Sequence, residues 1–103
     1  MIRIQVTIPN EEPYSVSSLR LPCTLGRSRK CDLMVRHPSV SGEHATLFER
    51  DGKVWIKDLG SRNGIRVATG LQDEIQLREG SSFDVGDIRC RVESLTIPTE
   101  QSF

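Results

Sequence analysis

The chain alternates apolar and polar side chains over much of its length, in short runs separated by turns. Every second residue of the segment IRIQVTI, residues 2–8, is apolar, which is the period-two pattern of a half-buried strand. The segment 88–92 repeats this pattern, and the apolar parity then shifts, which predicts a bulge near Glu93 and Ser94. Further candidate strands are residues 15–21, 23–26, 32–35, 44–50, 53–58, 64–67, 74–77 and 82–85. No stretch has a convincing helical period, so we predict an all-β sandwich or barrel.

The turn between two of these strands is the most specific local signal. Asp51 and Gly52 stand alone between alternating segments, and both residue types tolerate the positive φ of a two-residue type I′ hairpin turn. Arg50 then pairs with Lys53, and paired residues have numbers that sum to 103. This register brings residues 41–44, SGEH, to the same end of the hairpin as residues 60–64, GSRNG.

Composition narrows the possible functions. At 103 residues the chain has the size of one domain, and we expect it to span residues 1–97, with residues 98–103 as a C-terminal tail. Fourteen Lys and Arg residues balance fourteen Asp and Glu residues, so no global field attracts the chain to nucleic acid or an anionic membrane. No apolar run is long enough to span a membrane, and the N-terminal residues do not resemble a signal peptide. We therefore predict a cytoplasmic protein.

The cysteines point to no special chemistry. Their number is three, and none forms a C-x-x-C pair, so the sequence supports neither a disulfide framework nor a thiolate metal site. We expect Cys23, Cys31 and Cys90 to be buried, reduced thiols, and we expect no metal and no cofactor.

The two polar clusters carry the candidate chemistry. Together they offer hydroxyl, amide, guanidinium and glycine backbone donors at one end of a rigid hairpin, and few acids. Such a set suits a phosphate-sized anion. An attraction to anions would therefore be local.

Three motifs in order give the sequence a family resemblance. Gly26-Arg27, the S-x-x-H segment from Ser41 to His44, and Asn63-Gly64 have the spacing found in forkhead-associated (FHA) domains. The likeness extends over roughly residues 2–97. It implies a β-sandwich of about eleven mostly antiparallel strands that binds phosphothreonine peptides through loops at one end.

The resemblance also implies roles for single residues. Arg27 would grip the phosphate, Ser41 would donate to it, Ser61 would approach the phosphorylated residue, and Asn63 would hold the peptide backbone. The residues assigned to phosphopeptide binding are Arg27, Ser41, Gly42, Ser61, Arg62 and Asn63, and those assigned to structural support are Gly26, His44 and Gly64. Each also has a simpler reading: a solvated loop arginine, a turn serine, or an ordinary Asn-Gly turn.

One position departs from the family. The residue after the S-x-x-H serine often supplies a polar or basic side chain toward the phosphate, and here it is Gly42. A backbone N–H of Gly42 would replace that donor, or a basic side chain of Arg29, Lys30 or Arg62 would reach in from a neighbouring loop.

The sequence also bears on three alternative functions. A hydrolytic triad of Ser41, His44 and Asp58 is disfavoured, because no nucleophile elbow surrounds the serine. Nucleic-acid binding is disfavoured, because the sequence lacks aromatic residues interleaved with the basic ones on which bases could stack. An FHA fold that serves as an interaction surface without phosphate dependence stays open.

We therefore predict a monomeric, non-catalytic module. Its partner would be a phosphothreonine-containing protein, either a kinase or a kinase substrate. Near the C-terminus, Thr96 and Thr99 are conceivable phosphosites, although a final strand and a frayed end explain this segment more simply.

Overall fold

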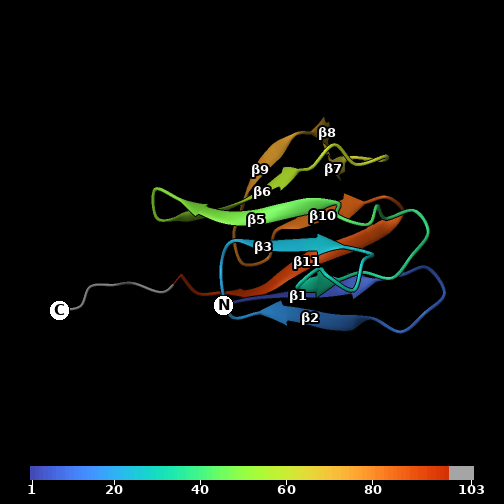
Figure 1. Ribbon diagram of the computed structural model, residues 1–103, viewed down its shortest axis with the longest axis horizontal. Helices are drawn as coiled ribbons and strands as arrows, with labels where there is room; N and C mark the ends of the chain where they lie inside the picture. The colour runs from blue at the N-terminus through green and yellow to red at the C-terminus, as the bar shows by residue number, and fades with distance from the viewer. Residues whose placement is uncertain (98–103) are drawn as a thin grey trace.

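The computed structural model describes residues 1–97, which form eleven strands and, within that range, no helix (Figure 1). The strands are β1 (Ile2–Thr7), β2 (Tyr14–Ser18), β3 (Cys23–Gly26), β4 (Leu33–Met34), β5 (Ala45–Arg50), β6 (Lys53–Asp58), β7 (Ile65–Val67), β8 (Gly70–Gln72), β9 (Glu74–Leu77), β10 (Ser82–Val85) and β11 (Ile88–Leu95). The all-β prediction is confirmed. The segment 98–103, predicted as a tail and including Thr99, lies outside the described residues.

The strands form two stacked sheets. One has six strands in the order β2-β1-β11-β10-β7-β8, and the other has five in the order β4-β3-β5-β6-β9 (Figure 1). The pairs are antiparallel except for β3 with β4, which are parallel. The fold is thus the sandwich of mostly antiparallel strands expected from the resemblance.

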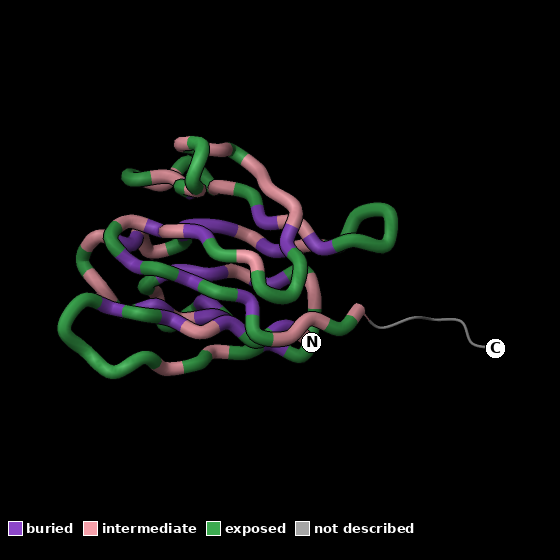
Figure 2. Tube along the Cα trace, turned by 180° about the vertical axis from the view of Figure 1, so that it is seen from behind, coloured by how far each residue is buried: buried purple, intermediate pink, exposed green. Residues whose placement is uncertain are grey.

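The core lies between the sheets. Alternate residues of the inner strands are buried and their neighbours are exposed, as the period-two pattern predicts (Figure 2). The largest fully buried side chain is Phe83, and aliphatic residues make up most of the remainder. Cys23, Cys31 and Cys90 are buried and unpaired, which confirms their predicted burial.

The strand predictions were accurate where alternation was clear. Strands β3, β6, β9 and β10 have the predicted bounds, and the bulge is confirmed because Arg3 pairs with Ser94 while Ile4 pairs with Val92. Strand β8 was missed. It has three residues, pairs only with β7 at the edge of its sheet, and exposes Leu71, so no alternating pattern marks it.

The β5–β6 hairpin has the predicted register. Arg50 pairs with Lys53 and Ala45 with Asp58, and Asp51 and Gly52 have φ of 56° and 75°. The turn forms the exposed tip of the hairpin at one end of the sandwich (Figure 2). The loops before β5 and after β6 therefore meet at the opposite end (Figure 1). Within residues 1–97, no helix is long and apolar enough to cross a membrane.

Candidate functional site

Three loops meet at this end of the sandwich: residues 27–32 after β3, residues 35–44 before β5, and residues 59–64 after β6. The first two are joined by backbone hydrogen bonds from Arg27 N–H to the Ser41 carbonyl and from Ser28 N–H to the Gly42 carbonyl, both 3.0 Å. Gly26 makes this close approach possible, because a Cβ there would lie 2.2 Å from the Gly42 oxygen. The G-R motif therefore fixes the position of the S-x-x-H loop.

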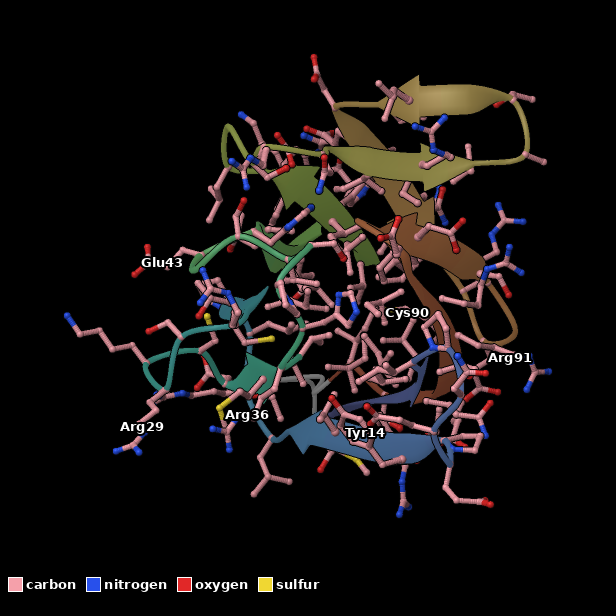
Figure 3. The ribbon with its side chains drawn as sticks, turned by 90° about the vertical axis from the view of Figure 1, so that its right-hand side faces the viewer. Tyr14, Arg29, Arg36, Glu43, Cys90 and Arg91 are labelled. Carbon is pink, nitrogen blue, oxygen red and sulfur yellow. The ribbon has the colours of Figure 1, made fainter. Side chains whose placement is uncertain are left out.

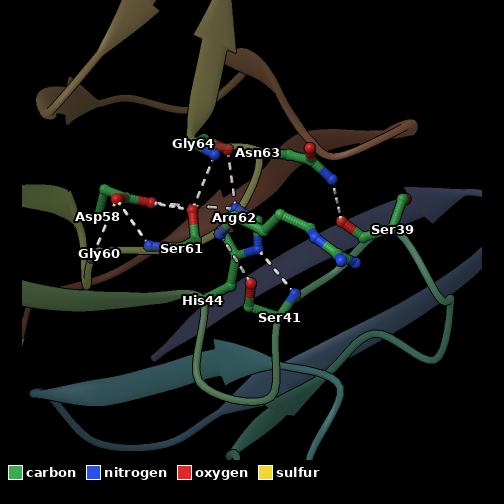
Figure 4. A network of polar contacts seen from close by, with 9 residues as sticks. All are labelled: Ser39, Ser41, His44, Asp58, Gly60, Ser61, Arg62, Asn63 and Gly64. Atoms are coloured by element: carbon green, nitrogen blue, oxygen red, sulfur yellow. Dashed lines mark hydrogen bonds and ion pairs between the residues drawn. The ribbon is translucent and has the colours of Figure 1, made fainter.

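His44 joins the second loop to the third. Its ring is fully buried; Nδ1 accepts a 3.1 Å hydrogen bond from the Ser41 N–H, and Nε2 lies 2.8 Å from the Gly64 carbonyl oxygen (Figure 4). Since Nδ1 is the acceptor, the proton is on Nε2, which donates to Gly64. Gly64 has a φ of 72°, in the left-handed region. The supporting role predicted for His44 thus corresponds to two definite hydrogen bonds.

The third loop is built around Asp58. Its carboxylate accepts hydrogen bonds from the N–H groups of Gly60 and Ser61, both 3.0 Å, and from the Ser61 hydroxyl (Figure 4). The same hydroxyl oxygen accepts a 2.8 Å bond from the Gly64 N–H. The hydroxyl of Ser61 is therefore engaged within its own loop, and its predicted approach to a phosphorylated residue stays a prediction.

Two side chains tie the second and third loops together at the surface. The Ser41 hydroxyl oxygen accepts a 3.0 Å hydrogen bond from the Arg62 N–H, and Asn63 Nδ2 donates a 2.7 Å bond to the Ser39 carbonyl (Figure 4). This contact agrees with the predicted register, in which paired residues have numbers that sum to 103. The hydroxyl proton of Ser41 donates to no group within residues 1–97, so it is available to a ligand.

The guanidinium group of Arg27 is only partly hydrogen-bonded. Its Nε donates a 3.0 Å hydrogen bond to the Val40 carbonyl, which leaves both terminal nitrogens without a hydrogen bond or an ion pair in the described part of the chain. Beside it is a hollow of about 220 Å³, which we call the serine hollow. Its lining consists of Arg27, Pro38, Ser39, Val40, Ser41, Gly42 and Arg62. The predicted arginine, serine and glycine thus meet around one space.

The side chains that line the serine hollow carry a net positive charge. Arg27 and Arg62 contribute two guanidinium groups, and its lining contains no acidic residue. Asp58 already accepts three hydrogen bonds within its own loop. The hollow is therefore suited to a compact anion that accepts several hydrogen bonds.

The same contacts disfavour a hydrolytic triad. His44 Nδ1 bonds to the backbone N–H of Ser41, not to its hydroxyl, and Nε2 bonds to the Gly64 carbonyl. Asp58 Oδ1 is 4.0 Å from Nε2. A base that activates a serine must contact its hydroxyl, and this histidine does not.

A family model described as FHA domain matches residues 23–86, more than half of the chain. The chain belongs to the FHA family. This FHA domain has the fold of the Slr1951 protein from Synechocystis sp., with a TM-score of 0.76, 23% identity, and coverage of 92% of this chain and 98% of that one. No curated protein matches the sequence closely enough to count as a relative.

Two further solved structures have the same fold. One, from a structural and functional analysis of phosphothreonine-dependent FHA domain interactions, has a TM-score of 0.74 and 20% identity over 93% of this chain and 98% of that one. The other is the FhaA FHA domain complexed with the intracellular domain of Rv3910, with a TM-score of 0.73 and 22% identity over 90% and 100%. At these identities the likeness concerns the fold.

The sequence reading of this FHA domain missed three supports of the site. Asp58 organises the third loop, and an Asp two residues before Gly60 is a sequence signal for such a turn. The Ser39 hydroxyl accepts a 2.9 Å hydrogen bond from the Asp87 N–H. Gly86 lies close to the same residue, because a Cβ added at Gly86 would be 2.3 Å from the Ser39 carbonyl oxygen. This contact joins segments far apart in the sequence, so no local pattern marks it.

Proposed function

We propose that this FHA domain is a phosphothreonine-peptide binding module that mediates phosphorylation-dependent protein interactions in signalling. The observation that carries the proposal is the set of unused donors around the serine hollow. These are the terminal nitrogens of Arg27, the hydroxyl proton of Ser41 and the N–H of Gly42, none of which donates to a group within residues 1–97.

The chemistry of a phosphoryl group matches this set. A phosphothreonine carries about −1.5 to −2 charges at neutral pH and three strong acceptor oxygens. The guanidinium group of Arg27 would bind two of these oxygens in parallel, while Ser41 and the Gly42 N–H would bind the remaining acceptor sites. Asn63, held by Ser39, has its Oδ1 left to accept an N–H of the peptide backbone.

The related structures support the same class of function. One belongs to work on phosphothreonine-dependent FHA domain interactions, and another contains the intracellular domain of a partner protein. We propose a phosphorylated kinase or kinase substrate as the partner, with no catalysis by the domain itself. The monomeric state, the cytoplasmic location and the absence of nucleic-acid binding stay predictions from the sequence.

The decisive experiment compares peptides that differ only in one phosphate. A pool of phosphothreonine peptides with degenerate flanking residues selects a sequence, and calorimetry then measures its affinity with phosphothreonine and with threonine. We expect binding only to the phosphorylated form. Equal affinity for both would establish the phosphate-independent interaction surface, and turnover of an activated ester lost in Ser41→Ala would establish a hydrolase.

A matched pair of variants locates the site. We expect Arg27→Ala to weaken binding of the phosphopeptide by about 2 to 5 kcal/mol, the range for removing one partner of a desolvated charge pair. Arg91→Ala, an exposed arginine on β11 outside the three loops, should leave the affinity unchanged. Retained affinity in a folded Arg27→Ala variant would place the phosphate elsewhere.

A further inference from the structure

A second hollow adjoins the serine hollow. We call it the arginine hollow; it has a volume of about 480 Å³ and is lined by Arg27, Arg29, Arg36, His37 and Pro38. Arg27 and Pro38 line both hollows. Arg29 and Arg36 come from the loops on either side of β4 and project from the same corner of the molecule (Figure 3). The two hollows therefore form one continuous surface with Arg27 between them.

The charge of the arginine hollow is not balanced within the described residues. Its lining contains three guanidinium groups and no acid, and none of the three makes an ion pair in residues 1–97. Two acids lie in the same loops. Asp32 is engaged by Arg20 at 3.7 Å and by the Thr24 N–H at 3.2 Å, and the side chain of Glu43 points away from Arg29 and Arg36 (Figure 3).

His37 adds an N–H donor to this lining. Its Nδ1 lies 2.8 Å from the Ser39 hydroxyl and accepts a 3.1 Å hydrogen bond from the Ser39 N–H. Since Nδ1 is an acceptor, the neutral ring has its proton on Nε2, which bonds to no group in the described part of the chain. The arginine hollow thus offers one N–H donor in addition to its guanidinium groups.

We propose that the arginine hollow binds a second phosphoryl group on the same peptide, so that the domain recognises a doubly phosphorylated segment. This inference rests on the proposed function, because the first phosphothreonine in the serine hollow positions the peptide. That phosphate neutralises Arg27 but leaves Arg29 and Arg36 unbalanced. A phosphoryl group matches them better than a carboxylate does, because it has up to two charges and a third acceptor oxygen.

The shared lining limits the spacing of the two groups. An extended chain covers about 3.3 to 3.6 Å per residue, so about four residues span roughly 13 Å. The two hollows share Arg27 and Pro38 in their linings, so a short peptide segment is enough to reach from one to the other. The second phosphorylated residue is therefore expected within about four positions of the first.

The test uses a peptide series with one fixed phosphothreonine. A second phosphothreonine is placed at each position up to about four residues before and after it. At each position, threonine and glutamate serve as controls. We expect one spacing at which the second phosphate raises affinity about tenfold, while glutamate raises it much less. The same gain from glutamate would overturn the assignment of a phosphoryl group, and no gain at any spacing would overturn the subsite.

Variants then test whether the arginine hollow is responsible. Arg29→Gln with Arg36→Gln should abolish the gain from the second phosphate, measured for each protein as the ratio of its affinities for the doubly and the singly phosphorylated peptide. Arg66→Gln with Arg91→Gln, two exposed arginines of the other sheet, is the control for net charge and should retain the gain. Equal loss in both double variants would overturn the proposal in favour of general electrostatic attraction. Equal binding of the singly phosphorylated and unmodified peptides would instead refute the underlying function.

Discussion

Glycines 26 and 42 illustrate how single residues determine the recognition loops. Gly26 is buried, and a Cβ there would meet the Gly42 carbonyl oxygen at 2.2 Å and the His44 nitrogen at 2.9 Å. A Cβ at Gly42 would have no atom within 4 Å, and Gly42 does not have a left-handed φ. Two glycines in touching loops therefore have opposite tolerance of a side chain.

This contrast gives a matched stability prediction. We expect Gly26→Ala to lower the free energy of unfolding by about 1 to 3 kcal/mol or more, because the new methyl group is forced against backbone atoms. Gly42→Ala should change it by less than about 0.5 kcal/mol, as at ordinary surface sites. Urea unfolding of both variants provides the measurement. A Gly26→Ala protein as stable as Gly42→Ala would contradict the close approach of the two loops.

Gly42 also provides a test of phosphate recognition. An arginine there would lie in the lining of the serine hollow without backbone strain, so Gly42→Arg should strengthen phosphothreonine-peptide binding by about 1 kcal/mol. The gain is smaller than a full charge-assisted bond because the side chain must be ordered. Calorimetry with one phosphopeptide measures it, and Gly42→Gln is the uncharged control. A stable variant with unchanged affinity would show that this position does not face the phosphate.

At the scale of elements, the β5–β6 hairpin carries the site from the sequence into space. Its turn residues determine the register, and the register brings the loops before and after the hairpin together. His44, one residue before β5, completes the connection through the Ser41 N–H and the Gly64 carbonyl. These two backbone groups lose their partner if the imidazole is removed.

We therefore expect His44→Phe to be destabilising although it keeps an aromatic ring of similar size. Leaving the part-buried Ser41 N–H and Gly64 carbonyl unsatisfied costs about 1 to 3 kcal/mol each, so the free energy of unfolding should fall by roughly 2 to 6 kcal/mol. Amide hydrogen exchange should also show faster exchange at Ser41. Wild-type stability in His44→Phe would mean that the two hydrogen bonds contribute little.

The same scale shows what the sequence could predict. Alternation and the Asp51-Gly52 turn were sufficient for the hairpin register and for the meeting of the two polar clusters, because these depend on local geometry. The direction of the Ser61 hydroxyl toward Asp58 and the contact of Gly86 with Ser39 were not predictable. Both depend on how loops pack after the sheets have formed. The arginine hollow belongs to this second class, since Arg29 and Arg36 come together only through the path of the chain around β4.

At the scale of the whole molecule, the positively charged loops lie at one end of the sandwich, apart from the apolar core between the sheets. The chain is neutral overall, yet the three loops concentrate arginines around two hollows, so attraction to a phosphopeptide is local. The interior between the sheets contains two thiols whose environment opposes ionisation. Burial raises the pKa of Cys23 from 9.0 to about 11 and that of Cys90 to about 12. Folding and proton binding are therefore linked at alkaline pH.

The sign of this linkage leads to a final prediction. Between pH 9 and 11 the thiols of the unfolded chain lose their protons while those of the folded chain largely keep them. The thiols therefore do not reduce the free energy of unfolding below about pH 9, and they reduce it progressively as the pH rises toward the folded pKa values. Each thiol should account for about 1 to 2 kcal/mol of the loss between pH 8 and about 10.5. Urea unfolding under reducing conditions, compared between the wild type and Cys23→Ala/Cys90→Ala, isolates this part, because all other titrating groups are common to both proteins. The variant should lose less stability over this interval even if it starts from a lower value. Identical losses would show that the two thiols ionise equally in the folded and unfolded chains, contrary to their burial in the core.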